Sequence, residues 1–108
     1  MISRRSLLFV AIAGAATWAL AKPASGKTKK VVIENIKFDP PEFAVDLGQT
    51  IEWENKDLVP HTVSADDNSF DSKQIDPGKT WSFKPTKKGT FAYKCNFHPN
   101  MLAKFTVK

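Results

Sequence analysis

The residues best suited to chemistry lie close together near the C-terminal end of the chain. Cys95, His98 and Met101 follow one another at intervals of three residues. Because three residues reach at most about 10 Å, and Pro99-Asn100 turns the chain, the three side chains can meet at one point. A second histidine, His61, lies at the mouth of another expected strand. The pattern predicts that all four side chains bind one metal ion.

A thiolate, two imidazoles and a weak thioether form the ligand set of a blue-copper electron-transfer site. Sulfur ligands favour Cu(I) and imidazole serves both oxidation states, so one fixed ligand set suits both. Singly, a lone Cys, His or Met is more often structural than a ligand. The chain has one cysteine, and an unpaired thiol in an oxidising compartment needs protection, which metal ligation supplies. We therefore expect one type 1 copper ion per chain as cofactor.

The segments that must position these residues have the pattern of β-strands. From Val31 onward apolar and polar residues alternate with a period of two, as in Phe91, Tyr93 and Cys95. Side chains spaced in this way share one buried face of a strand. Breakers such as Pro40-Pro41 and Pro77-Gly78 separate the runs. Short strands with regular turns predict an antiparallel sandwich or barrel.

The part of the chain from 31 to 108 resembles a cupredoxin, most of all the amicyanins of the plastocyanin-like group. The residues that carry the resemblance are Trp53-Glu54-Asn55, Pro60-His61-Thr62-Val63, Gly89-Thr90-Phe91-Ala92-Tyr93-Lys94-Cys95 and the Cys95-x-x-His98-Pro99-x-Met101 ending. The resemblance implies an all-β, Greek-key β-sandwich of about eight strands, a type 1 copper and one-electron shuttling in the bacterial periplasm. It also implies that His61 is the more buried ligand and His98 the exposed one, through which electrons pass.

One position departs from the family pattern. Relatives commonly carry Asn directly after the first ligand histidine, where this chain has Thr62. In relatives that side chain ties the two ligand loops together. A threonine hydroxyl can form a similar hydrogen bond but has a shorter reach. The sequence therefore does not decide which hydrogen bonds surround the metal and tune its reduction potential.

The N-terminal segment predicts export. Residues 1–21 combine a basic start, an apolar run of 14 residues and an Ala-Leu-Ala ending, which are the three parts of a cleavable signal peptide. The pair Arg4-Arg5 suits a twin-arginine signal. Since a membrane-spanning helix needs about 20 apolar residues, we expect membrane contact only if the signal stays uncleaved. We expect a flexible basic leader over 22–30 and a cupredoxin domain over 31–108, located in the periplasm.

The positive charge lies outside the expected domain. The whole chain carries a net charge of +5, but residues 31–108 contain 10 lysines against 11 acidic residues, a net charge of −1. Nucleic-acid binding requires a basic patch on the domain itself, so we expect no nucleic-acid partner. Enzyme activity is not expected either, because both histidines of the chain are proposed ligands. The pair Asp66-Asp67 has the composition of a turn.

The expected partners are redox proteins, a dehydrogenase or a cytochrome, that dock near His98 on a monomeric carrier. An apolar surface drawn from Phe97, Pro99, Leu58 and Val59 would suit the weak, fast encounters of redox proteins, which need only a small interface. The alternative is that Phe97 and Leu58 pack inward. Apolar loop residues often do so, and the sequence leaves both possibilities open.

Two other functions stay open. A periplasmic copper carrier or storage module uses similar soft ligands but exchanges its metal readily; such proteins often have extra Met or His tracts, which this chain lacks. A zinc site is the second alternative. It would use Cys95, His98 and His61 with a carboxylate from Asp66 or Asp57, since zinc accepts thiolate, imidazole and carboxylate ligands but takes a thioether poorly.

Overall fold

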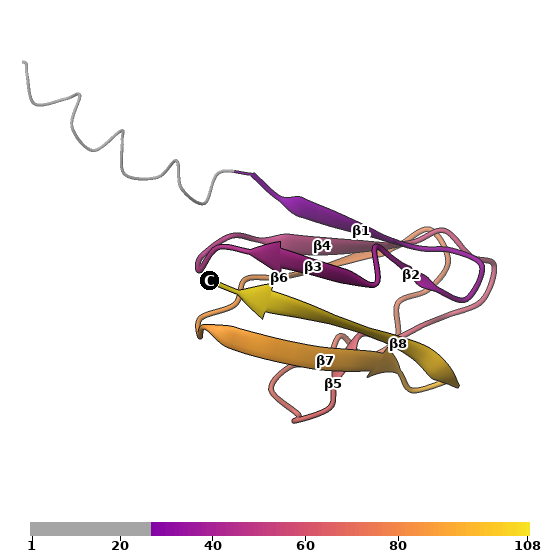
Figure 1. The fold of residues 1–108 in the computed structure, drawn as a ribbon. Helices are drawn as coiled ribbons and strands as arrows, with labels where there is room; N and C mark the ends of the chain where they lie inside the picture. The colour runs from indigo at the N-terminus through magenta and orange to yellow at the C-terminus, as the bar shows by residue number, and fades with distance from the viewer. Residues whose placement is uncertain (1–26) are drawn as a thin grey trace, which may run out of the picture.

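The computed structural model describes residues 27–108 (Figure 1). The expected signal peptide over 1–21 and the first part of the expected leader lie outside the described residues, so these assignments remain predictions. Within 27–108 there is no helix with the length and apolar character needed to cross a membrane.

In the part of the chain that the structure describes, eight strands form two sheets of four strands each. Their bounds are β1 (Lys29–Ile33), β2 (Phe38–Asp39), β3 (Glu42–Val45), β4 (Ile51–Asn55), β5 (Ser64–Ala65), β6 (Thr80–Phe83), β7 (Gly89–Cys95) and β8 (His98–Val107). One sheet has the order β2-β1-β4-β6 and the other the order β3-β8-β7-β5. Figure 1 shows the two sheets as layers of a sandwich. The expected all-β sandwich of about eight strands is confirmed.

Two strand pairs differ from the antiparallel pattern that the turns predicted. β1 runs parallel to β4, and β3 runs parallel to β8. In each pair the two strands are separated in sequence by other strands, so the chain crosses over before it returns. Parallel pairing is possible only with such crossover connections, which short-range turn signals do not reveal.

The ordered domain begins earlier than the expected boundary at Val31. Lys29 and Lys30 belong to β1, where they pair with Ile51 and Glu52 of β4. The Lys30 ammonium lies 2.8 Å from the Glu52 carboxylate. Strand pairing uses the backbone and therefore tolerates lysine wherever the side chain can reach solvent. The last two residues of the expected flexible leader over 22–30, Lys29 and Lys30, are therefore part of the sheet.

Aromatic side chains fill the space between the sheets. Trp53, Tyr93 and Phe105 are fully buried, and the rings of Trp53 and Tyr93 meet edge to face with centroids 5.6 Å apart. The indole N–H of Trp53 donates to the Tyr93 hydroxyl over 3.2 Å, which satisfies the polar atoms that these side chains bring into the core. Because Tyr93 lies two residues before Cys95 on β7, this packing fixes the strand that carries the cysteine.

The β7–β8 hairpin brings the C-terminal candidate residues together. Cys95 ends β7 and pairs directly with His98 at the start of β8, across a turn at Asn96-Phe97. The regular register, in which Lys94 faces Leu102, shifts at Cys95. Continued by one step, that register would have placed Met101 opposite Cys95. The shift leaves Met101 in an irregular stretch beside the cysteine, with its side chain buried.

We predict that Phe105→Ala destabilises the fold by roughly 3–5 kcal/mol, because it removes a fully buried ring and leaves a cavity. The matched control is Leu102→Ala on the same strand, where the side chain is 61% exposed; this change should cost less than about 0.5 kcal/mol. Urea unfolding of the metal-free variants measures both. Equal losses in the two variants would contradict the assignment of the core.

Candidate metal centre

Three of the four expected site residues meet at one end of the sandwich. The Cys95 sulfur lies 3.6 Å from Nδ1 of His61 and 3.6 Å from Nδ1 of His98. The three donor atoms all lie within 4.8 Å of one another. Cys95 and His61 are fully buried, whereas His98 is half-buried. One histidine is therefore enclosed and the other reaches the surface, as the family resemblance implied.

The separations of these atoms fit a single transition-metal ion. Taking zinc as the reference, imidazole nitrogen binds at about 2.0–2.1 Å and thiolate sulfur at about 2.3 Å, so a sulfur and a nitrogen on one ion lie roughly 3.5–3.8 Å apart. The observed 3.6 Å falls in that interval for both histidines. One soft sulfur with two imidazoles is also a donor set that copper accepts in both oxidation states.

Met101 is the fourth site residue that the sequence suggested. Its side chain is buried beside the β7–β8 turn, and it lines the same depression as His98. A thioether carries no charge and binds weakly, so Met101 would contribute less to holding a metal than the thiolate and the two imidazoles.

Asp57 orients the buried histidine. Its carboxylate lies 2.8 Å from Nε2 of His61, on the side of the ring away from Cys95. A carboxylate that accepts a hydrogen bond from Nε2–H keeps the proton on Nε2, which leaves Nδ1 unprotonated and free to bind a metal. The backbone N–H and C=O of His61 both pair with Ile75, at 3.1 and 2.8 Å. The ring is thus fixed from its backbone and from its far nitrogen.

This geometry excludes Asp57 and Asp66 as ligands in the alternative zinc site. Asp57 contacts the nitrogen of His61 that points away from the cysteine, so it cannot join the same ion. Asp66 forms an ion pair with Lys94 at 3.4 Å and is not part of the donor cluster. The sequence suggested Asp57 as a zinc ligand, whereas in the structure its carboxylate contacts the ring of His61. The spacing of four residues between Asp57 and His61 was the sequence feature that could have indicated this contact.

A strained turn supports Asp57. Its carboxylate accepts the backbone N–H groups of Asn35 and Ile36, over 2.7 and 2.9 Å. Both residues have positive φ, 58° and 57°, and form the two-residue turn between β1 and β2, a turn that normally prefers Asn-Gly. Burial by itself would raise the pKa of Asp57, but the bonds from Ile36, His61 and Asn35 outweigh it and lower the pKa. The carboxylate therefore stays ionised.

Thr62 ties the two loops of the site together. Its backbone N–H points to the Cys95 sulfur at 3.4 Å, and its hydroxyl accepts the backbone N–H of Asn96 over 2.9 Å. Ser64 extends this contact, since its hydroxyl lies 2.9 Å from that of Thr62 and accepts the side-chain amide of Asn96 over 3.0 Å. The threonine thus forms the loop-to-loop bond that the sequence left open, and Ser64 is a member of the network that sequence reasoning missed.

Exposed apolar side chains lie in the segments next to both histidines. Leu58 is 93% exposed, Phe97 is 49% exposed, and Val59 and Pro99 also face solvent. These residues therefore do not pack inward, which decides the question left open by the sequence. Ile36 adds a fifth exposed apolar side chain, since it lines the depression that also contains Phe97, His98 and Pro99. Its place in a distant turn hid it from sequence reasoning.

Comparisons with known proteins agree on one family. A model of the cupredoxin-like domain matches residues 6–107. Amicyanin-alpha of Methylorubrum extorquens is 30% identical over 103 residues, which cover 91% of this chain and 86% of the relative. Amicyanin of Paracoccus denitrificans is 29% identical over 96 residues, 84% and 72% of the two chains. A solved Cu(I) form of an amicyanin mutant aligns with a TM-score of 0.70 at 29% identity, covering 75% of this chain and 82% of that one.

We predict that Ile36→Gly stabilises the fold by about 1 kcal/mol, because glycine adopts positive φ without the steric cost that an L-residue bears there. Ile36→Ala is the matched control. It removes the same apolar side chain but keeps an L-residue in the turn, so it should bring no gain. Thermal unfolding measures both variants, and equal stabilities would show that the turn is not strained.

We predict that Asp57→Asn weakens copper binding roughly 10- to 100-fold, since it removes the charge that orients His61 and holds the turn. Asp66→Asn, which removes an exposed carboxylate outside the cluster, is the control and should leave the affinity unchanged. Competition with a chelator of known affinity measures the effect. The positioning role would be rejected if both variants bound copper as tightly as the parent protein.

Proposed function

The chain belongs to the cupredoxin family, and on that basis we propose that it is a periplasmic type 1 copper protein that carries single electrons between redox partners. The observation that carries the proposal is the approach of one cysteine sulfur to two histidine Nδ1 atoms at 3.6 Å. Cupredoxins bind one type 1 copper ion, which supplies a one-electron Cu(II)/Cu(I) couple.

The proposed ligands are the four residues that the sequence suggested. His61, Cys95 and His98 would hold the copper, and Met101 would supply a fourth, weaker donor. The ion would be reached from solvent mainly through His98, because Cys95 and His61 are fully buried. An electron would therefore enter and leave at the edge of the His98 ring.

Bonds already present in the protein favour fast transfer. The His61 ring is held through Asp57 and through its backbone pairing with Ile75, and the Cys95 sulfur receives the Thr62 N–H. Because these bonds are present without a metal and hold the donor atoms in place, the donor atoms need to move little when an electron arrives. Preorganised polar groups of this kind reduce the cost of reorganisation at the moment of reaction.

The surface around His98 suits a transient protein partner. We define the docking face as Ile36, Leu58, Val59, Phe97 and Pro99. Ile36, Phe97 and Pro99 line one depression with the half-buried His98, and Leu58 and Val59 are exposed in the segment that leads to His61. A small apolar face can exclude water from the contact without the large buried area that a permanent complex needs. A dehydrogenase or a cytochrome is the proposed class of partner, and the carrier acts as a monomer.

The periplasmic location rests on the N-terminal sequence. Residues 1–21 have the composition of a cleavable export signal. A buried, metal-bound Cys95 would also be protected from oxidation in that compartment.

An electron carrier is better supported than a copper carrier or an enzyme. Ready exchange of copper requires donors that an acceptor protein can reach, but the sulfur of Cys95 and the ring of His61 are fully buried. A second, substrate-binding metal would require further histidines, and the chain has only two.

The optical spectrum tests this proposal. The purified protein loaded with Cu(II) should absorb strongly in the red, where copper–thiolate charge transfer occurs, and reduction should bleach the band. Cys95→Ser should abolish the band, whereas Ser72→Ala, which leaves the cluster intact, should keep it. A copper-loaded parent protein without this band would contradict the proposal.

We predict that Phe97→Ala slows electron self-exchange between the Cu(I) and Cu(II) forms by roughly fivefold, because it removes apolar contact beside His98 and so costs about 1 kcal/mol of encounter energy. Leu47→Ala is the matched control, since Leu47 is similarly exposed but lies outside the docking face. Line broadening in NMR spectra of mixed-oxidation samples measures the rate. Equal slowing by both variants would remove Phe97 from the docking face.

A further inference from the structure

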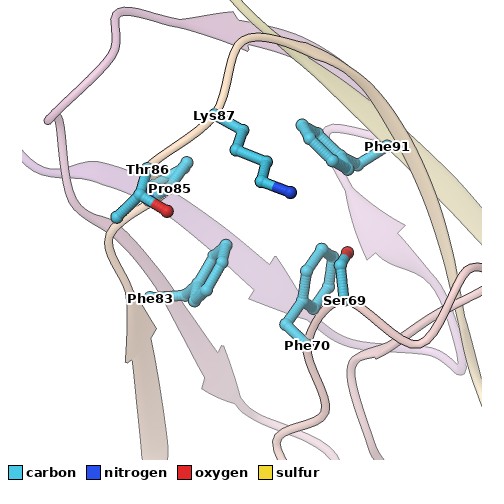
Figure 2. Close-up of a pocket in the computed structure, with 7 residues that line it drawn as sticks. All are labelled: Ser69, Phe70, Phe83, Pro85, Thr86, Lys87 and Phe91. Carbon is cyan, nitrogen blue, oxygen red and sulfur yellow. The ribbon is translucent and has the colours of Figure 1, made fainter.

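A cavity remote from the metal cluster has features that the electron-carrier function does not use. It has a volume of about 260 Å³ and lies between edge strand β6 of one sheet and β7 of the other. We call it the aromatic pocket; its lining residues are Ser69, Phe70, Phe83, Pro85, Thr86 and Lys87, with Phe91. Figure 2 shows these side chains directed around one common space. None of them belongs to the metal cluster or the docking face.

The walls of the aromatic pocket are formed before any ligand binds. Phe70 is buried, and its ring centroid lies 4.8 Å from that of Phe83 and 6.5 Å from that of Phe91. The same ring packs at 5.7 Å against Phe105 in the core. Since these rings are fixed by the packing between the sheets, a ligand would not have to order them on binding, which lowers the cost of association.

The mouth of the aromatic pocket carries a cation. In Figure 2 the Lys87 side chain extends over the space between Phe83 and Phe91, with its ammonium group directed toward the interior. Within residues 27–108 the ion pairs join Lys30 to Glu52, His61 to Asp57 and Lys94 to Asp66, and Lys87 is in none of them. Its ammonium is therefore available to a bound anion.

One acidic group acts on the same region. Asp67 accepts the backbone N–H of Ser69 over 2.9 Å. Hydrogen bonds from the hydroxyl and the amide of Ser69 lower the pKa of Asp67, and the charge of Lys87 contributes. An ionised Asp67 near the mouth would partly repel an anionic ligand. Removing its charge should therefore tighten binding, whereas removing the charge of Lys87 should weaken it.

We propose that the aromatic pocket binds small aromatic carboxylates of one or two rings, with the rings packed against the phenylalanine side chains and the carboxylate on the Lys87 ammonium. The aromatic walls select an apolar, flat body, and the single cation selects one negative charge at its end. The volume is adequate, because an apolar cavity of about 150 Å³ already accepts benzene. Inorganic anions would leave the rings unused, and neutral aromatics would leave the ammonium unpaired.

The aromatic pocket operates independently of the metal site. Phe91 precedes Cys95 by four residues along β7, a distance of about 13 Å along an extended strand. Binding therefore should not displace any donor atom, and it can be measured on the protein with its copper in place and reduced.

Titration of the ¹⁵N-labelled Cu(I) protein with 2-naphthoate tests the proposal. We expect saturable shifts of backbone amides at Ser69, Phe70, Lys87 and Phe91, with a Kd on the order of 1 mM for a ligand of this size. Lys87→Met should weaken binding about tenfold, as expected for loss of a charge-assisted hydrogen bond. The matched control is Lys88→Met, the adjacent lysine outside the lining, which should leave the Kd unchanged. Asp67→Asn should tighten binding.

Several results would overturn this assignment. They are equal weakening by Lys87→Met and Lys88→Met, binding of the neutral 2-naphthalenemethanol as tightly as 2-naphthoate, shifts scattered over the domain, or no saturable shift at all. Each of these outcomes leaves the red absorption of the copper protein untouched, so failure here is distinct from failure of the electron-carrier proposal.

Discussion

The close approach of the Cys95 sulfur to two imidazole nitrogens is the constraint on which the rest of the site depends. Without a metal, the three candidate ligand atoms, which lie within 4.8 Å of one another, do not by themselves stabilise the fold by much. Polar atoms lose their contacts with water on burial, and this loss costs free energy. The surrounding bonds must therefore impose the arrangement. The two-sheet sandwich supplies the strands, and the loops at one end supply the hydrogen bonds.

Three separate parts of the chain contribute to this arrangement. The β7–β8 turn brings His98 next to Cys95, the Thr62 hydroxyl ties this turn to the loop that carries His61, and Asp57 fixes the far side of the His61 ring. Asp57 is in turn held by the N–H groups of the β1–β2 turn. A residue of that turn, Ile36, also faces the surface near His98. The strained backbone there lies in the proposed docking face, and strained residues often cluster at functional sites.

The sequence predicted the parts of the molecule that depend on local spacing. The interval between Cys95 and His98 and the period-two alternation are local patterns, and they led to these two members of the donor cluster and to the strands. The contacts of Asp57 with Asn35 and Ile36 join residues about twenty positions apart, so no local pattern reports them. The early start of β1 was missed because Lys29 and Lys30 have the composition of a linker, although backbone pairing with β4 orders them.

X-ray absorption at the copper edge of the purified, copper-loaded protein tests the central claim most directly. The account predicts one short copper–sulfur distance together with two nitrogen neighbours, and loss of the sulfur contribution when Cys95 is replaced by Ser. A coordination shell of nitrogen and oxygen atoms alone in the parent protein would contradict it.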